Sequence, residues 1–189
     1  MTPLKREKIK AKVCMVGDNS VGKTSLIRRY VHDSFEDKYL ATLGAKVTKK
    51  REIVPFPELG VEFDVAMIIY DIMGAKEFRN LLREAYFFGA QGLIAVCDMT
   101  SGETFESLED WILNTYNVTG QIPIELLGNK IDKRDELVVS ESEIRKLSEC
   151  YGGPHKLTSA KTGKNVEPAF GDIAKLLAKR SLRASLIEN

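Results

Sequence analysis

The most informative segment of this chain reads Gly17-Asp18-Asn19-Ser20-Val21-Gly22-Lys23-Thr24. It follows the apolar run Val13–Val16 and precedes a helix-period segment, so its G-x-x-x-x-G-K-T pattern joins a predicted strand to a predicted helix. Backbone N–H groups of such a loop, together with the positive end of the helix dipole, favour a bound anion. We therefore predict a phosphate-binding loop. An ordinary glycine-rich turn would leave the adjoining Lys-Thr pair unexplained.

The side chains of this loop suit a nucleotide with Mg²⁺. Lys23 supplies a positive charge for the β- and γ-phosphates. The Thr24 hydroxyl is a hard oxygen ligand of the kind that Mg²⁺ prefers, and Mg²⁺ usually keeps several waters. We assign the phosphate contacts to Asn19, Ser20, Val21, Gly22, Lys23, Thr24 and Ser25.

Length and composition predict one globular domain with no strong charge preference. The chain has 189 residues, a formal net charge of +1 and a pI near 7.7, which gives no overall nucleic-acid or membrane signal. No apolar run approaches the length of about 18 residues that a membrane span needs. Three cysteines, Cys14, Cys97 and Cys150, predict reduced thiols and a cytoplasmic location rather than a disulfide framework.

Short apolar runs alternate with helix-period segments, which is typical of an α/β fold with a mostly parallel sheet and helices on both faces. We expect a basic N-terminal segment at 1–11, a domain at 12–180 and a tail at 181–189. The six predicted strands are 12–16, 45–54, 61–70, 92–98, 122–128 and 155–157, and the second and third form an antiparallel edge hairpin. Helices are predicted at 23–32, around 78–85, after a capping box at Thr100–Glu103, at 140–149 and at 165–180.

Proline residues mark the expected hairpin turn, Pro55–Gly60. Proline cannot donate a ladder hydrogen bond, so we place both Pro55 and Pro57 in the turn. The strand that follows becomes almost wholly apolar and is then followed by Asp71. Ligands in open α/β sheets bind at the carboxyl ends of strands, so Asp71 is a candidate to hold Mg²⁺ through water. The alternative is an aspartate that only begins a turn.

A second motif, Asn129-Lys130-Ile131-Asp132, follows the fifth predicted strand and indicates base recognition. The Asp132 carboxylate can accept hydrogen bonds from N1–H and N2–H₂ of guanine, which adenine lacks, and a buried carboxylate left unpaired costs about 1–3 kcal/mol. Lys130 can lie along the base, and the Asn129 amide can join loops. Ser159-Ala160-Lys161, after the last strand, can close the same pocket.

Together these motifs resemble the Ras-like small GTPases, and the resemblance covers Lys12 to about Arg180. The stretches Glu103–Leu108 and Tyr39–Gly44 are most similar to the Rab branch. The resemblance implies a phosphate-loop G domain that binds GTP or GDP with Mg²⁺ and acts as a switch. By this resemblance Thr42 meets Mg²⁺ and the γ-phosphate, Gly74 donates its N–H to the γ-phosphate, and Phe35 and Tyr39 lie at the nucleotide. Lys23, Thr42 and Gly74 are then the expected catalytic residues, and Thr24, Thr42 and Asp71 the metal site.

Three features depart from the family pattern. Ala75 stands where the family usually has the Gln that orients the attacking water, so we expect intrinsic GTP hydrolysis to be slow, at or below about 10⁻⁴ per second. No cysteine follows Cys150, so we expect no C-terminal prenylation and only peripheral membrane contact, if any. The connection from Thr42 to Asp71 is also longer than usual, which alters a possible effector surface.

Two other functions fit part of the pattern. A persistently GTP-loaded interaction module without useful turnover would explain Ala75. A phosphate-loop kinase or ATPase would keep Gly17–Thr24 but would leave Asn129–Asp132 unexplained. For the leading hypothesis, the expected partners are an exchange factor, an activating protein and an effector, with no nucleic acid.

Overall fold

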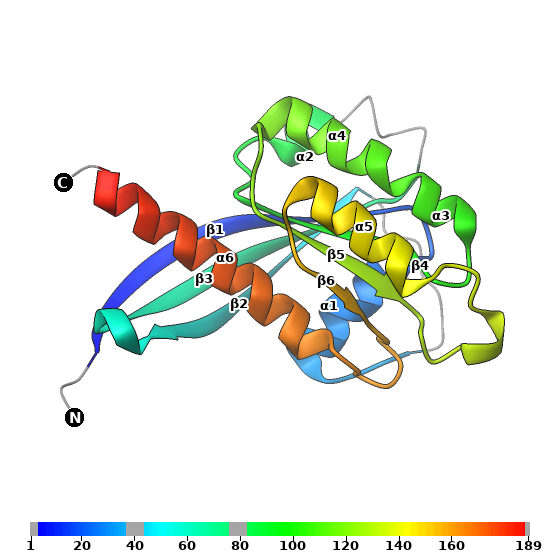
Figure 1. The fold of residues 1–189 in the computed structure, drawn as a ribbon, viewed down its shortest axis with the longest axis horizontal. Coiled ribbons are helices and arrows are strands. Elements are labelled where there is room, and N and C mark those ends of the chain that lie inside the picture. Colours follow the sequence, from blue (N-terminus) through cyan, green and yellow to red (C-terminus); the bar gives the residue numbers. More distant parts are fainter. Residues whose placement is uncertain (1–3, 37–43, 76–82, 188–189) are drawn as a thin grey trace.

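The computed structural model describes residues 4–36, 44–75 and 83–187, which form a six-stranded sheet covered by helices on both faces (Figure 1). The strand order is β2-β3-β1-β4-β5-β6. Every neighbouring pair is parallel except β2 and β3, which form an antiparallel hairpin at one edge. The predicted α/β fold with its antiparallel edge hairpin is therefore confirmed. The strands are β1 Lys5–Val16, β2 Ala45–Phe56, β3 Val61–Ile72, β4 Gly92–Asp98, β5 Ile124–Asn129 and β6 His155–Leu157.

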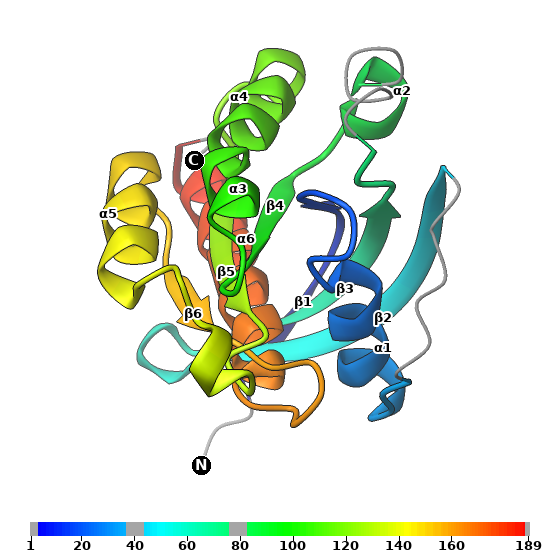
Figure 2. The same cartoon turned by 90° about the vertical axis from the view of Figure 1, so that its right-hand side faces the viewer.

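The sheet divides the apolar core into two clusters, and helices cover each of them. The α-helices are α1 Lys23–His32, α2 Arg83–Phe87, α3 Gly102–Glu106, α4 Leu108–Thr119, α5 Glu141–Tyr151 and α6 Val166–Ile187, with 3₁₀ turns η1 Pro57–Leu59 and η3 Arg134–Glu136. Leu26 of α1 and Phe170 of α6 pack against one sheet face, whereas Trp111 of α4 and Ile144 of α5 pack against the other. Figure 2 shows the strands passing between α2 and α4 on one side and α1 on the other.

The hairpin is longer than predicted, and so is β1. β1 begins at Lys5 rather than Lys12 because Lys5 to Met15 all pair with β3, in register with Val61 to Asp71. β2 continues to Phe56, so Pro55 lies in a strand and not in the turn. That position is tolerated because β2 is an edge strand, where a missing N–H can face solvent.

Two helix ends also differ from the sequence prediction. The capping box expected at Thr100–Glu103 was wrong: α3 begins after Ser101, which makes no side-chain cap, and the Thr100 hydroxyl instead donates to Asp98 Oδ1 at 2.7 Å. A capping box does form at α5, between Ser140 and Glu143. Helix α6 continues to Ile187 rather than Arg180.

Part of the predicted helix around 78–85 lies outside the described residues. The described portion, α2, begins at Arg83. Among the described residues, no helix combines the length and the apolar character that crossing a membrane requires.

Candidate nucleotide-binding site

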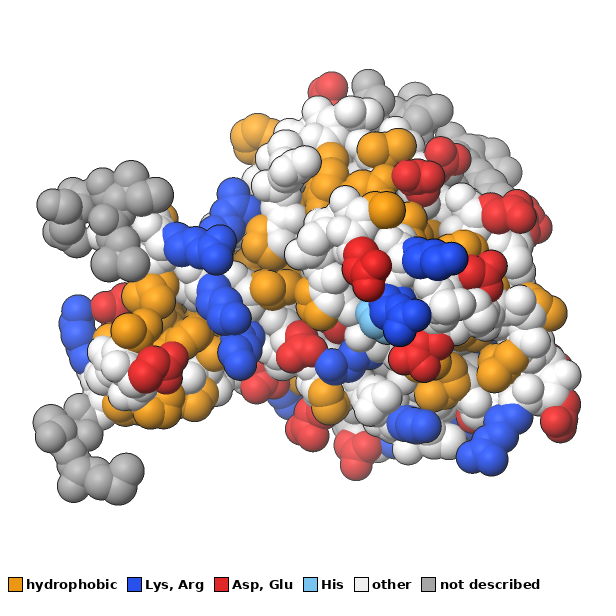
Figure 3. Space-filling model, viewed as in Figure 1, with side chains coloured by type: hydrophobic (Ala, Val, Ile, Leu, Met, Phe, Trp, Pro, Cys, Tyr) orange, Lys and Arg blue, Asp and Glu red, His pale blue; other side chains and the backbone are white. Residues whose placement is uncertain are grey.

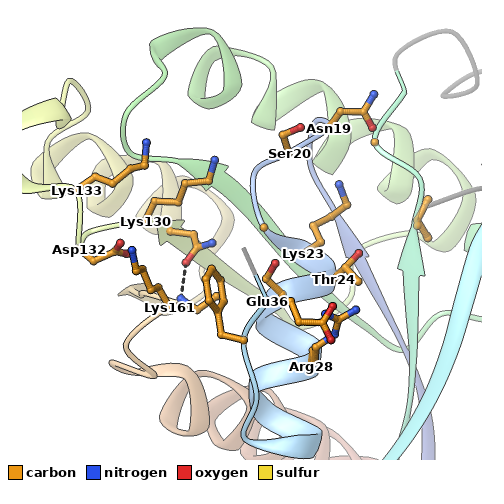
Figure 4. Close-up of a pocket in the computed structure, with 17 residues that line it drawn as sticks. Asn19, Ser20, Lys23, Thr24, Arg28, Glu36, Lys130, Asp132, Lys133 and Lys161 are labelled. Carbon is orange, nitrogen blue, oxygen red and sulfur yellow. Dashed lines mark hydrogen bonds and ion pairs between the residues drawn. The ribbon is translucent and has the colours of Figure 1, made fainter. Parts of the chain in front are cut away.

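A cavity of about 350 Å³ opens where β1, β3 and β5 end, at the carboxyl edge of the sheet (Figure 4). Figure 4 shows Asn19, Ser20, Lys23 and Thr24 at one end and Lys130, Asp132, Lys133 and Lys161 at the other. Of the residues singled out from the sequence, those that line the cavity are Asn19, Ser20, Gly22, Lys23, Thr24, Ser25, Phe35, Gly74, Asn129, Lys130, Asp132, Ala160 and Lys161. Two distant motifs, one for phosphate and one for a base, thus face one cavity.

The loop from Gly17 to Gly22 is shaped by close contacts that only glycine permits. Gly22 has φ 101, and a Cβ there would lie 2.3 Å from Asn129 Nδ2. A Cβ on Gly74 would lie 2.4 Å from the carbonyl carbon of Asp18, so the segment after β3 rests directly on the loop. The side chain of Val21 is fully buried in the core and anchors the loop. Val21 therefore offers only its backbone to a ligand.

Asp18 joins this loop to the start of α4, which covers the face of the sheet opposite α1. Its carboxylate accepts hydrogen bonds from Trp111 Nε1 at 2.8 Å and from Ser107 Oγ at 2.6 Å. Both partners lie about ninety residues further along the chain, and no local pattern in the sequence pointed to them. They fix the outer side of the loop while its inner side faces the cavity.

Lys23, the first residue of α1, is the principal cation at the phosphate end. Its ammonium donates to the carbonyl oxygens of Gly17 at 2.7 Å and Asp18 at 2.8 Å, so it lies folded over the loop. Burial lowers the pKa of Lys23 to about 8, while the nearby Asp71 and Asp18 carboxylates act in the opposite direction. A bound anion would favour the charged form of this amine.

Thr24 and Asp71 bring two hard oxygen atoms together beside Lys23. The Thr24 hydroxyl donates to Asp71 Oδ2 at 2.5 Å, and Asp71 is almost fully buried at the end of β3. No cluster of three or more His, Cys, Asp or Glu side chains suited to a metal occurs in the described ranges. The Thr24 hydroxyl and the Asp71 carboxylate are the kind of donors that fit Mg²⁺, which usually binds through one or two protein oxygens, phosphate oxygens and water.

Asn129 joins three loops at the centre of the cavity. Its Nδ2 donates to Val21 O at 2.9 Å, and its Oδ1 accepts from Thr158 Oγ1 and from the Ala160 N–H, both at 3.2 Å. Asn129 is almost completely buried. The amide therefore holds the phosphate loop and the 158–161 loop in a fixed relation, the role expected of it from the sequence.

At the other end of the cavity, Asp132 and Ser159 face each other. Ser159 Oγ donates to Asp132 Oδ1 at 2.6 Å, which fixes the carboxylate, and Ser159 itself is buried and does not line the cavity. Lys130 has a positive φ of 70, and its ammonium pairs with Asp98 at 2.6 Å. The Asp132 carboxylate can accept two adjacent hydrogen bonds from the edge of a flat base. The aliphatic part of Lys130 can lie along the face of the same base.

Sequence reasoning missed several residues of this cavity. Arg28 and Glu36, which form an ion pair at 2.7 Å, also line it, as do Ile72 and Lys133. Arg29 of α1 supports the 158–161 loop from outside by donating to the carbonyl oxygens of Ala160 at 3.0 Å and Lys161 at 2.8 Å. Arg28 and Arg29 lie within α1, which follows the loop, but nothing local in the sequence indicates what a half-buried arginine contacts. Tyr39 and Thr42, expected at this site, lie outside the described residues.

Comparisons with known proteins agree with this geometry. The sequence model of the Ras family matches residues 12–179. Human Ras-related protein Rab-27B is 35% identical over 175 residues, which cover 89% of this chain and 80% of that protein. The Ypt/Rab-type GTPase YPT7 of Saccharomyces cerevisiae is 35% identical over 177 residues, covering 90% of this chain and 82% of its own length. The chain therefore belongs to the Ras family as a small GTP-binding switch protein of the Rab type.

Proposed function

We propose that the protein cycles between GTP and GDP, hydrolyses GTP slowly, and signals through the segments 33–44 and 74–86. The observation that carries this proposal is the single cavity with Lys23 at one end and the Asp132 carboxylate, held by Ser159, at the other. In a guanine nucleotide, the phosphates are anions that suit Lys23, and N1–H and N2–H₂ are donors that suit the Asp132 carboxylate. Adenine would leave a partly buried carboxylate unpaired, which costs about 1–3 kcal/mol.

The residues proposed for hydrolysis are Lys23, Thr42 and Gly74. Lys23 holds its charge at the phosphate end, and Gly74 lies against the backbone of Asp18 and Asn19, where its N–H can meet a γ-phosphate. Mg²⁺, when bound, neutralises charge that develops on the phosphate oxygens. For the metal we propose Thr24 and Asp71, whose oxygens already lie together, with Thr42.

Ala75 is the reason to expect slow turnover. Its methyl side chain has no polar group that could orient a water molecule for attack, the task that the family's Gln performs. The polar neighbours Lys76 and Glu77 lie outside the described residues. An activating protein that supplies its own catalytic group is an alternative route to turnover. The second candidate function, a module that stays loaded with GTP, rests on the same alanine.

The deciding experiment identifies the nucleotide that co-purifies with the wild-type protein and follows its conversion for about a day in Mg²⁺, beside Ala75→Gln. GTP that persists in wild type and is hydrolysed by Ala75→Gln supports slow turnover caused by the alanine. Steady hydrolysis by wild type, unchanged in Ala75→Gln, contradicts that role. Addition of cell extract separates the two candidates, because an extract-stimulated rate excludes a module that never turns over.

Asp132→Asn tests base recognition in the same assay. We expect GDP affinity to fall by about 5- to 150-fold, which corresponds to about 1–3 kcal/mol, with little change in unfolding. Binding of ATP as tightly as GTP by the wild type would contradict the guanine assignment. An exchange factor and an effector remain predictions, as does the cytoplasmic location, for which the support is the free state of Cys14, Cys97 and Cys150.

A further inference from the structure

The extended end of the sheet concentrates positive charge that the net charge of the chain hides. We call this region the basic arm, defined as residues 5–12 of β1, 49–64 of β2, η1 and early β3, and 175–187 of α6. It contains twelve Lys or Arg residues against five Asp or Glu, a formal charge of +7. The other residues carry sixteen against twenty-two, a formal charge of −6. Figure 1 shows the arm extending away from the nucleotide cavity, which lies at the opposite end of the strands.

Within the arm, β1 has an open edge. It pairs with β3 from Lys5 to Met15, but with β4 only from Val13 to Val16. The side of β1 that faces away from β3 therefore has no neighbouring strand along residues 5–11 among the described residues. Open strand edges are templates for pairing with another chain unless a protein blocks them.

Hydrogen bonds show which backbone groups of β1 point toward this edge. Lys5 N–H donates toward β3, to Gly60 O at 2.9 Å, whereas the N–H and C=O of Lys12 both bond to Gln91 on the opposite side, at 3.3 and 2.8 Å. Successive residues of a strand direct their backbone groups to alternate sides. The N–H and C=O groups of Arg6, Lys8 and Lys10 therefore point outward, in line with the bonds that Gln91 makes to Lys12.

Arg6, Lys8 and Lys10 also place their positively charged side chains beside the open edge of β1. These side chains are exposed and share one face of the sheet, the face opposite α6. Glu62 pairs with Arg6 at 2.6 Å, but within the described ranges Lys8 and Lys10 form no salt bridge. On the opposite face, Lys175, Lys179 and Arg183 recur at four-residue spacing along α6, and Figure 3 shows Lys and Arg side chains gathered where α6 crosses β1.

We propose that the open edge of β1 at Arg6–Lys10 is a docking site for an extended acidic segment of a partner protein, which adds to the sheet as a strand. Such a segment satisfies the outward N–H and C=O groups and places carboxylates opposite Lys8 and Lys10, as cross-strand pairs of opposite charge. A second copy of this chain is disfavoured, because β1 against β1 would bring like charges together. A flat anionic membrane cannot meet cations on both faces of the sheet or bond to both kinds of backbone group.

Hydrogen exchange of individual amides tests the geometry, using the GDP-bound full chain and a synthetic peptide of alternating Glu and Thr. In the free protein, the amides of Arg6, Lys8 and Lys10 should exchange quickly, and those of Glu7 and Ile9 slowly. The peptide should slow exchange at Arg6, Lys8 and Lys10 by at least tenfold. The same peptide with its pairing amides N-methylated should not. Unchanged exchange at these three amides, or equal protection by the N-methylated peptide, would overturn strand addition.

Paired variants separate charge from backbone pairing. Lys8→Glu/Lys10→Glu should weaken peptide binding at least tenfold, whereas Lys146→Glu/Lys164→Glu, the same change in net charge at exposed sites elsewhere, should not. Lys8→Pro should bind more weakly than Lys8→Ala, because proline also removes an outward N–H without removing a bond to β3. Urea unfolding checks that each variant is folded. Equal loss in both charge-reversal pairs, or tighter binding to phosphatidylserine vesicles than to the peptide, would refute the proposal.

Discussion

Replacing Glu125 by Gln is expected to stabilise the protein at alkaline pH and to change little at acidic pH. Glu125 lies in β5 on the face covered by α6, has no exposed surface, and neither carboxylate oxygen accepts a hydrogen bond from a described residue. The charged groups that face it are Lys156 of β6 and Asp172 of α6, which pair with each other at 2.5 Å. Burial raises the pKa of Glu125 from 4.5 to about 8, with Asp172 adding to the rise and Lys156 opposing it.

The sign and size of the effect follow from proton linkage. Between about pH 4.5 and pH 8 the folded protein keeps the proton on Glu125 while the unfolded chain loses it, so stability falls as pH rises. A shift of this size corresponds to about 1.4 kcal/mol per pH unit and about 5 kcal/mol in total. Gln cannot ionise, so it removes this loss and should exceed the wild type by up to about 5 kcal/mol above pH 8.

Urea unfolding from about pH 5 to pH 9, at one saturating GDP concentration, measures this difference. The nucleotide must be held constant because any ligand of the folded state adds to stability. Glu149→Gln, a change at an exposed glutamate of α5, is the matched control and should follow the wild-type curve. Parallel curves for wild type and Glu125→Gln across this range would refute the assignment of a raised pKa to Glu125.

Three other substitutions test contacts seen in the structure. Ser140→Ala, which removes the capping box of α5, should lower the free energy of unfolding by about 1 kcal/mol, whereas Ser101→Ala, at a helix start without a side-chain cap, should be nearly neutral; equal effects in urea unfolding would contradict this. Trp111→Phe removes the donor to Asp18 and should cost about 1.5–3 kcal/mol; an unchanged unfolding midpoint would show that this bond contributes nothing. Asn129→Ala releases three loop contacts and should speed GDP dissociation at least tenfold in a fluorescent-nucleotide assay, and an unchanged rate would count against its joining role.

The sequence by itself determined the order of the elements and the chemistry of the loops. The helix Lys23–His32 and the strands Gly92–Asp98 and His155–Leu157 have the predicted bounds. They are short segments whose apolar spacing and flanking residues are local properties. The phosphate loop and the Asn129–Asp132 segment were likewise identified from residue type and spacing. Their common cavity followed from one general rule, that parallel strands end at the same edge of the sheet.

Only the tertiary structure decided which distant segments meet. The charged residues Lys5–Ala11 do not resemble a buried strand, and they form a largely exposed extension of β1 because β3 provides a pairing partner. Two contacts join residues far apart in the chain: Asp18 with Trp111, and Arg29 with the 158–161 loop. The burial of Glu125 without a hydrogen-bond donor among the described residues depends on how α6 packs over β5. Local pattern sets what a segment can form, but strand register and packing between layers fix its neighbours, and those neighbours determine hydrogen bonding, burial and pKa.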